Sequence, residues 1–383
     1  MNKNWLSLLG VVITVGLYAC IEQTPIDIEN DTSIGKLDSL FISQPVVEAT
    51  AGKPVNTGSS PLLLLGQADN KRAAFLIKFR NFPDSVVVQS AQLRLINTIT
   101  TGDSIGTIRA TVHRVMAAWE ETEITFAGFQ NQFDPVPVGE TVLAPADSDT
   151  VYISIDPDLV TAWIDSSIQN YGLYVTAEGG RFFKQFNSGN SVSGPPVLTI
   201  TYAPPDNPDT TLTADAVVEA DAFLFEVLNP PAQGPLYVSD GDDYRSLLKF
   251  DLAAIPQNAT INQAILTLYV DSLNSFLNSK EGHMIDVYRL TQESLDPSTA
   301  EFDTANTINA AAAVVVDTTT VLNINITRQV QNWSFGLNEN FGLMLVSRRP
   351  ERELYRTAFY SARMDSSRAP RVRIVFTIPP VRE

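Results

Sequence analysis

The sequence predicts an all-β protein: two tandem antiparallel β-sandwiches with jelly-roll-like connections, each carrying one short helix. The dominant hydrophobic period is two, as where Phe75, Ile77 and Phe79 share one face of a strand. Clusters of Gly, Pro, Asp and Asn separate such short runs, which is the spacing typical of antiparallel sandwiches. The chain also repeats itself with a period of about 170 residues, so the sandwich is expected twice.

The first residues have the layout of a secretory signal. A short polar start with Lys3 precedes an apolar run over 5–19 that is too short for a stable spanning helix. The run ends in Leu17-Tyr18-Ala19-Cys20, which resembles the lipobox of bacterial lipoproteins. The resemblance implies that residues 1–19 are a cleaved signal peptide and that Cys20 is lipidated. The alternative is an ordinary cleaved signal followed by an incidental cysteine.

Lipidation at Cys20 implies a protein anchored through lipid to a membrane of the cell envelope, with the outer membrane or the cell surface as the expected location. Cys20 is the only cysteine of the chain, so the exported body contains no disulfide. A body of this length can bury a sufficient core without one.

The remaining chain divides at its composition changes. We expect the lipidated Cys and a polar spacer over residues 20–44, the first sandwich over 45–202, and the second over 215–379. The segment between them, 203–214, is rich in proline, which lacks the donor that a central strand needs, and it is predicted to be a linker.

The repeat is carried by landmarks in the same order in both copies. Val46-Val47-Glu48-Ala49 recurs as Val217-Val218-Glu219-Ala220, and each copy closes with a proline-led strand, at 196–200 and at 370–374. One helix per copy is expected before a tryptophan, over 156–163 and 327–333. Asp156 and Thr327 are the expected caps, and Trp163 and Trp333 are read as core residues.

Composition narrows the function. The formal net charge is −17 and the pI is near 4.5, which argues against nucleic acid as a partner because phosphates are neutralised by Lys and Arg. The two histidines, His113 and His283, have no neighbours in the sequence that would complete a catalytic triad or a zinc site. We therefore expect a non-catalytic protein, and a monomer.

One acidic turn is a weak metal candidate. Asp240, Asp242 and Asp243 lie within four residues and could offer carboxylate oxygens to Ca²⁺. A solvated acidic turn between strands is the alternative. No other cofactor is expected.

Several segments together resemble a known family. They are the strand Arg245 to Phe250, the segment Trp119-Glu120-Glu121-Thr122, the Asn170-Tyr171-Gly172-Leu173 strand and the closing Pro196 to Ile200 strand. The series resembles the DNRLRE domain family, β-sandwich modules of secreted and surface proteins that are similar to carbohydrate-binding modules described for alginate. The second copy departs from the pattern, since Ser294 stands where Trp119 would recur.

Six residues are candidates for contact with a glycan. Arg371 and Arg373 alternate with apolar residues near the C-terminus, so both guanidinium groups leave one strand face and could bind carboxylates in pairs of hydrogen bonds. Lys78, Lys249 and Arg94 also lie on non-core strand faces. Trp119 could be an exposed stacking platform, with a core position as the alternative. For the Arg pair the alternative is a solvated outer sheet face.

The leading interpretation is a membrane-anchored, non-catalytic protein whose two modules bind polysaccharide, with an acidic one such as alginate favoured by the arginines. The rival is a structural or adhesive envelope protein whose modules dock other proteins, and an exposed apolar patch would favour it. A weaker rival is a polysaccharide-degrading enzyme, which needs two suitably spaced carboxylates.

Overall fold

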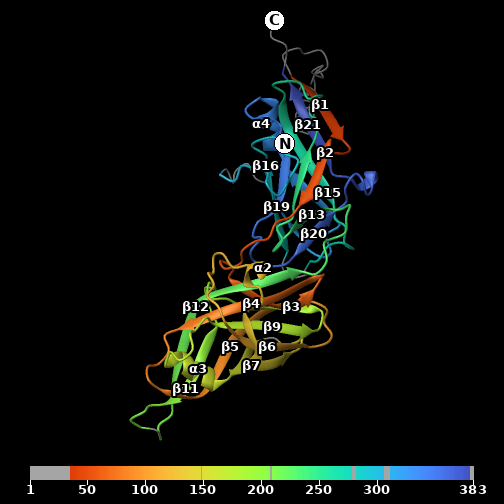
Figure 1. The fold of residues 1–383 in the computed structure, drawn as a ribbon. Coiled ribbons are helices and arrows are strands. Elements are labelled where there is room, and N and C mark those ends of the chain that lie inside the picture. Colours follow the sequence, from red (N-terminus) through yellow and green to blue (C-terminus); the bar gives the residue numbers. More distant parts are fainter. Residues whose placement is uncertain (1–34, 148, 208, 278–281, 306–310, 380–383) are drawn as a thin grey trace, which may run out of the picture.

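The computed structural model describes residues 35–147, 149–207, 209–277, 282–305 and 311–379. The predicted signal peptide and Cys20 lie outside these residues. Antiparallel strands are the dominant secondary structure of the described chain, which forms two bodies stacked end to end (Figure 1), as the alternating pattern predicts. Among the described residues, no helix has the length and apolar character needed to cross a membrane.

The first sandwich is built from one ten-stranded antiparallel sheet that folds back on itself. Its order is β12-β11-β5-β10-β3-β4-β9-β6-β7, β8 pairs with β5, and a β12–β4 pairing joins the first strand of the path to a strand in its middle. The strands are β3 (Leu62–Ala68), β4 (Lys71–Arg80), β5 (Val87–Gly102), β6 (Ile108–Val115), β7 (Phe133–Leu143), β8 (Thr150–Ile155), β9 (Leu173–Gly179), β10 (Phe182–Asn187), β11 (Val197–Ala203) and β12 (Leu212–Val227).

The second sandwich packs a four-stranded sheet, β1-β21-β15-β18, with a five-stranded sheet, β17-β16-β19-β14-β2, and a β13-β20 pair. The strands are β1 (Lys36–Ile42), β2 (Val47–Ala51), β13 (Leu236–Ser239), β14 (Arg245–Lys249), β15 (Thr260–Tyr269), β16 (His283–Arg289), β17 (Ala311–Val315), β18 (Val321–Asn325), β19 (Leu343–Ser347), β20 (Arg356–Phe359) and β21 (Arg371–Ile378).

The two copies exchange their first strands. Val47–Ala51 of the first copy pairs with β14 of the second sandwich, whereas Val217–Val227 of the second copy pairs with β4 of the first. Two further pairings belong to the same exchange. The N-terminal β1 pairs with β21 of the second sandwich, and the start of β12 pairs with β11 of the first. In Figure 1 the red β1 and β2 lie among the blue and teal strands of the upper body. We call β1, β2 and β12 the exchanged strands.

This exchange places two segments differently from the predicted boundaries. Residues 36–42, expected in the spacer, form β1, because Leu40 and Ile42 pack inward against the second core. Residues 203–214, expected as a linker, connect β11 to β12 as a hairpin in which Tyr202 pairs with Leu212. The prolines end β11 as expected, but the chain reverses there and does not pass into the second sandwich.

Three short α-helices and one 3₁₀ turn accompany the strands. They are α2 (Phe126–Phe129), α3 (Pro157–Ile164), α4 (Thr327–Ser334) and η2 (Ser366–Arg368). Asp156 caps α3 by accepting the N–H of Asp158, as predicted. The prediction for Thr327 is wrong: the cap of α4 is Ile326 with no side-chain bond, and Thr327 accepts the N–H of Ala264 instead.

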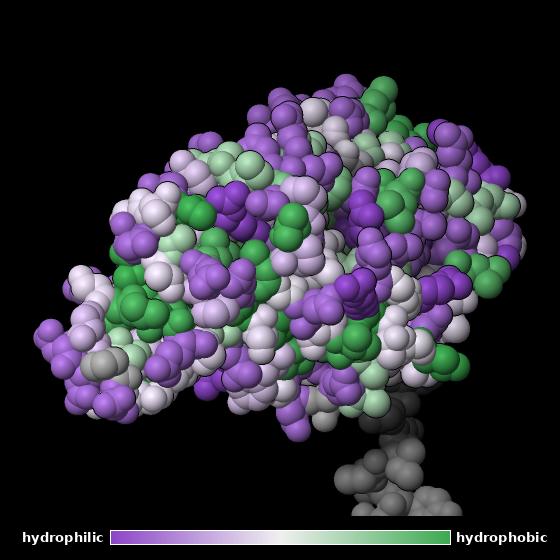
Figure 2. All heavy atoms as spheres, turned by 60° about the horizontal axis from the view of Figure 1, so that its bottom comes forward, coloured by the Kyte–Doolittle hydropathy of each residue, from purple (hydrophilic) through white to green (hydrophobic). Residues whose placement is uncertain are grey.

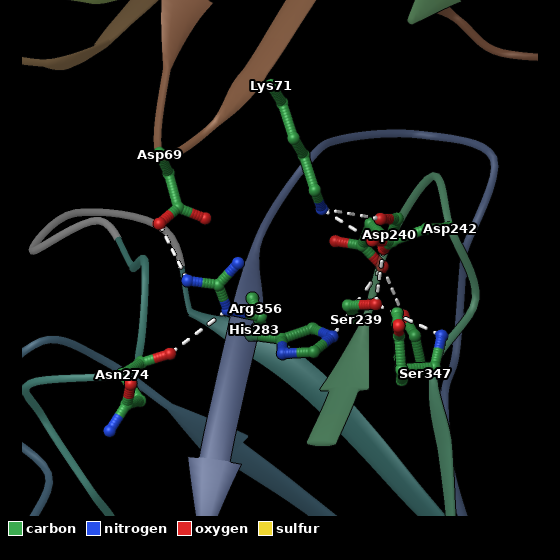
Figure 3. A network of polar contacts seen from close by, with 10 residues as sticks. Asp69, Lys71, Ser239, Asp240, Asp242, Asn274, His283, Ser347 and Arg356 are labelled. Carbon is green, nitrogen blue, oxygen red and sulfur yellow. Dashed lines mark hydrogen bonds and ion pairs between the residues drawn. The ribbon is translucent and has the colours of Figure 1, made fainter. Parts of the chain in front are cut away.

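Each sandwich has its own apolar core. Phe75, Ile77 and Phe79 of β4 lie in the first core, together with the buried Trp163. The inward residues of β15 and β21 form the second, against which the partly buried Trp333 packs. The contact between the bodies combines apolar packing, with Leu354 and Phe276 against the first core, and polar contacts, and Figure 3 shows Asp69 and Lys71 reaching toward the second sandwich.

Candidate functional site

The arginines nearest the C-terminus lie on β21, an inner strand of the four-stranded sheet. Val372 and Ile374 point into the second core, so the alternation sends Arg371 and Arg373 to the opposite face. The register carries this face across the sheet, because Phe41 of β1 and Ile265 of β15 both pair with Arg373.

We call this outer surface the Arg371 face. It consists of Leu37, Ser39, Phe41, Gln263, Ile265, Thr267, Tyr269, Val321, Asn323, Asn325, Arg371, Arg373, Val375 and Thr377. Its only ionisable charges are the two arginines, so the face is positive although the chain carries a net charge of −17. The remaining side chains are hydroxyls, amides and apolar groups.

The two arginines differ in how they are held. Arg371 is half-buried, donates from Nη2 to the carbonyl of Ser367, and lies 4.7 Å from the centre of the Tyr269 ring. This stacking fixes the guanidinium plane while leaving it charged. Arg373 is exposed, and no carboxylate of the described residues forms an ion pair with either arginine.

Several other arginines of the C-terminal region form ion pairs with acids. Arg348 binds Asp286, Arg356 binds Asp69, and Arg363 lies 3.9 Å from Glu48. These acids come from distant parts of the chain, so the charges of these three arginines are balanced by contacts that only the fold creates.

The acid nearest to Arg371 in the sequence, Asp365, is also engaged in hydrogen bonds with other residues. Asp365 accepts hydrogen bonds from Ser367 and Arg368, which lower the pKa of its carboxyl to about 2. The Arg368 guanidinium in turn lies over the Tyr360 ring at 3.6 Å. The charge of Asp365 is therefore engaged by Arg368.

The first sandwich has a matching face, where Arg94 lies. On β5, Arg94 pairs with Tyr152 of β8 on one side and Val197 of β11 on the other. Tyr152 is 54% exposed and offers an aromatic surface beside the guanidinium. Asp215 on the same face makes it neutral overall, so the second sandwich is the stronger candidate for an anionic ligand.

Lys249 lies on the five-stranded sheet, away from Arg371 and Arg373, and Lys78 lies on β4, which is not a direct neighbour of the β5 strand that carries Arg94. Each forms an ion pair, Lys78 with Glu219 at 2.9 Å and Lys249 with Glu293 at 3.4 Å. Lys249 borders a hollow of about 660 Å³ that Trp333 also lines. Asp251 and Glu339 line the same hollow and leave it net negative.

Trp119 is placed as a packing residue. It is partly buried against a small cluster that contains Leu76, Phe129 and Tyr174, and its indole N–H donates to the carbonyl of Tyr171 at 2.8 Å. The ring thus packs against its own sandwich and keeps only part of its surface exposed, which limits it as a platform for sugar rings.

The acidic turn considered for calcium is buried at the contact between the sandwiches (Figure 3). Asp242 Oδ1 lies 3.0 Å from the Lys71 ammonium and accepts the Ser239 hydroxyl, and Asp240 accepts the Ser347 hydroxyl. Asp243 binds Arg245, and burial raises the pKa of its carboxyl. Within the described ranges, no group of three or more metal-binding side chains is assembled.

The two histidines are buried, and three of their four ring nitrogens have hydrogen-bond partners. His283 Nδ1 lies 2.8 Å from the Thr357 hydroxyl, and its Nε2 is 3.5 Å from Asp240. His113 lies between the Asp134 carbonyl and the Thr111 hydroxyl. Since both rings are less than 10% exposed, neither is presented to a polymeric substrate.

One comparison with known protein families covers the strand that carries Arg371 and Arg373. Residues 213–375 match the model of carbohydrate-binding module family 96. The match supports a carbohydrate-binding module, one that runs from β12 to β21 and includes Arg371 and Arg373. It leaves β1, β2 and the body of the first sandwich outside.

Other comparisons add little. The C-terminal domain of the Streptococcus agalactiae AgI/II polypeptide BspA is 12% identical, covering 87% of this chain and 92% of its own, at a TM-score of 0.15. The VP2 subviral particle of infectious bursal disease virus is 10% identical, covering 90% and 77%, at a TM-score of 0.13. Scores this low carry no argument. No curated protein matches the chain.

Sequence reasoning missed the aromatic neighbours of the arginines. Phe41 pairs with Arg373 on the neighbouring strand, and Tyr152 pairs with Arg94. The Tyr269 ring lies 4.7 Å from the Arg371 guanidinium. The alternating pattern predicts which face of a strand each side chain lies on. It does not predict which strand is the neighbour, because that depends on the register and on the exchange of strands between the sandwiches. The one indication in the sequence is that these aromatic residues stand at outward-facing positions of predicted strands.

Proposed function

We propose that this protein is a non-catalytic lipoprotein of the bacterial cell envelope, outer membrane or cell surface that captures acidic polysaccharide on the Arg371 face. The observation that carries the proposal is an acid-free sheet face whose two arginines belong to the region that matches a carbohydrate-binding family. Guanidinium groups bind carboxylates in planar pairs of hydrogen bonds, and a uronic-acid polymer offers one carboxylate per sugar.

The resemblance to DNRLRE domains, seen in both copies, supports the same assignment and favours alginate among acidic polymers. The first sandwich, with Arg94 and Tyr152 on its equivalent face, would supply a second and weaker contact. Two linked contacts raise avidity through effective concentration. The chain would act as a monomer, and neither a metal nor nucleic acid enters the proposal.

The position of β1 bears on how an anchored protein would stand. Lys36 pairs with Ile378 at the end of the second sandwich, far from the 203–211 turn at the tip of the first (Figure 1). Lipid at Cys20 would therefore hold the second sandwich nearest the membrane, although it is second in the sequence.

This orientation can be measured on the lipidated chain in liposomes. A fluorophore on Asp38→Cys should transfer energy to a lipid dye more efficiently than one on Asp206→Cys. Equal transfer would contradict the orientation, and absence of the chain from the liposomes would contradict the anchor.

The binding proposal is tested with the soluble chain starting after Cys20. Its migration in native gels containing alginate, another polyuronate or a neutral glucan is compared with that of the Arg371→Ala/Arg373→Ala variant. We expect retardation by a polyuronate and its loss in the variant. Arg181→Ala is the matched control, because its side chain is 82% exposed on the other sandwich. Absence of retardation across the panel would sink the proposal.

A docking protein is the second candidate, and one observation favours it. Leu37 and Phe41 on the Arg371 face are 64% and 58% exposed, which is unusual for large apolar side chains grouped on one face. On the side of the molecule seen in Figure 2, however, apolar residues lie in separate groups among polar ones. Capture of a protein partner with no glycan retardation would favour this candidate.

A further inference from the structure

The Arg371 face is completed by a strand from outside the matched module. Strand β1 is the edge of its sheet and pairs with β21 from Lys36–Ile378 to Ile42–Val372. The family match begins only at residue 213. The N-terminal segment of the chain therefore supplies one side of the face.

The inward residues of β1 are sufficient to hold this strand in place. Leu40 and Ile42 pack against the second core, and backbone pairing with β21 runs the length of the strand. Phe41 points the other way and remains 58% exposed. Its ring contributes little to the core, so its position calls for another explanation.

The register sets Phe41 directly opposite Arg373. The row continues across the sheet through Ile265 to Asn325. With strands about 4.8 Å apart, the row is about 14 Å long. An aromatic ring, a free guanidinium, an apolar patch and an amide thus follow one another along a line.

We propose that Phe41 is a ligand-binding residue, the aromatic platform that completes this site across the exchange. The apolar C–H face of a pyranose ring lies on the Phe41 ring, and the carboxylate of the same or the next uronic acid binds Arg373. Asn325 Oδ1 accepts the Thr327 N–H at 2.9 Å, so its Nδ2 group is the donor offered to hydroxyls at the far end of the row. The inference rests on the proposed function and extends it, because the binding unit then includes an N-terminal strand from outside the matched module.

The test is the affinity of the full soluble chain for alginate, measured by isothermal titration calorimetry. Phe41→Ala should bind about 2- to 12-fold more weakly, the equivalent of an aromatic contact. Val314→Ala is the matched control, because Val314 is a similarly exposed apolar residue (54%) on β17 of the five-stranded sheet, outside the Arg371 face. Its affinity should stay within twofold of the unchanged chain.

Two further variants separate stacking from packing. Phe41→Leu keeps an apolar side chain and should bind as weakly as Phe41→Ala, whereas Phe41→Trp should retain affinity and change its fluorescence when alginate is added. Unchanged affinity in Phe41→Ala, with binding lost in Arg371→Ala/Arg373→Ala, would overturn this inference and leave the proposed function standing. If the unchanged chain itself does not bind, both fail.

Discussion

Lys71 is the residue at which the coupling of the two sandwiches can be measured. It starts β4 of the first sandwich, and its side chain is 1% exposed. Its ammonium group lies 3.0 Å from Asp242 Oδ1 and 3.3 Å from the Asp240 carbonyl, both in the second sandwich (Figure 3). Replacing Lys71 by Met keeps most of the volume but leaves a buried carboxylate without its cation.

The expected cost follows from burial. Removing one partner of a buried ion pair typically lowers the free energy of unfolding by about 3–5 kcal/mol. Lys78→Met is the matched control on the same strand, because its pair with Glu219 is 29% and 39% exposed. Exposed pairs contribute about 0–1 kcal/mol. Lys71→Met/Asp242→Asn should recover much of the loss, since the unpaired charge is then absent.

The assay is equilibrium urea unfolding of the soluble chain, followed by tryptophan fluorescence. Trp163 reports on the first sandwich and Trp333 on the second, and Lys71→Met should shift the signal of both. A loss as small as that of Lys78→Met would refute the reasoning. So would a double variant no more stable than Lys71→Met.

Three other predictions concern single residues and salt. Glu48→Ala should lower the free energy of unfolding by about 1–3 kcal/mol, because the carboxylate accepts the N–H groups of Ala362 and Arg363 and ties β2 to the second sandwich; an unchanged urea midpoint would contradict this. Burial raises the pKa of Asp221 to about 7, so the folded state binds the extra proton and stability should fall as pH rises from about 4 to 7. Asp221→Asn should flatten that slope in urea titrations at several pH values, and an identical slope would show that another group is responsible. Binding to a polyuronate should weaken as NaCl is raised, since exposed charges are screened, and salt-independent affinity would exclude a role for the arginines.

The sequence predicted those parts of the fold that depend on local patterns. The period-two alternation at Phe75, Ile77 and Phe79 identified a strand and its core face, and Asp156-Pro157 identified the start of α3. The repeat predicted two related sandwiches. These features need only the chemistry of neighbouring residues.

The sequence could not predict which copy of a repeated strand enters which sandwich. Val47 and Val218 stand in equivalent motifs, so either could pair with β4 or β14. Contacts from distant residues distinguish the two slots: Glu48 meets the loop after β20, whereas Asp221 accepts the N–H of Gly189 after β10. This is why the predicted boundaries of the spacer and the linker differ from those in the structure.

For the same reason, only part of the candidate site could be predicted from the sequence. Arg371 and Arg373 could be placed on one face from alternation alone, but Phe41 is far from them in the sequence and meets them only through the exchange. Conversely, Trp119 and the acidic turn at Asp242 attracted attention by residue type. Their partners, the Tyr171 carbonyl and Lys71, could not be inferred from local spacing.

The most direct test of the account is the dissociation constant for a uronic-acid polymer of the soluble chain and of its Arg371→Ala/Arg373→Ala variant. Charge-assisted hydrogen bonds contribute about 1.5–3 kcal/mol each, so losing one such contact should weaken binding about 10- to 150-fold. Arg181→Ala should bind as the unchanged chain does. Equal affinity of the double variant and the unchanged chain would show that the Arg371 face is not the binding site.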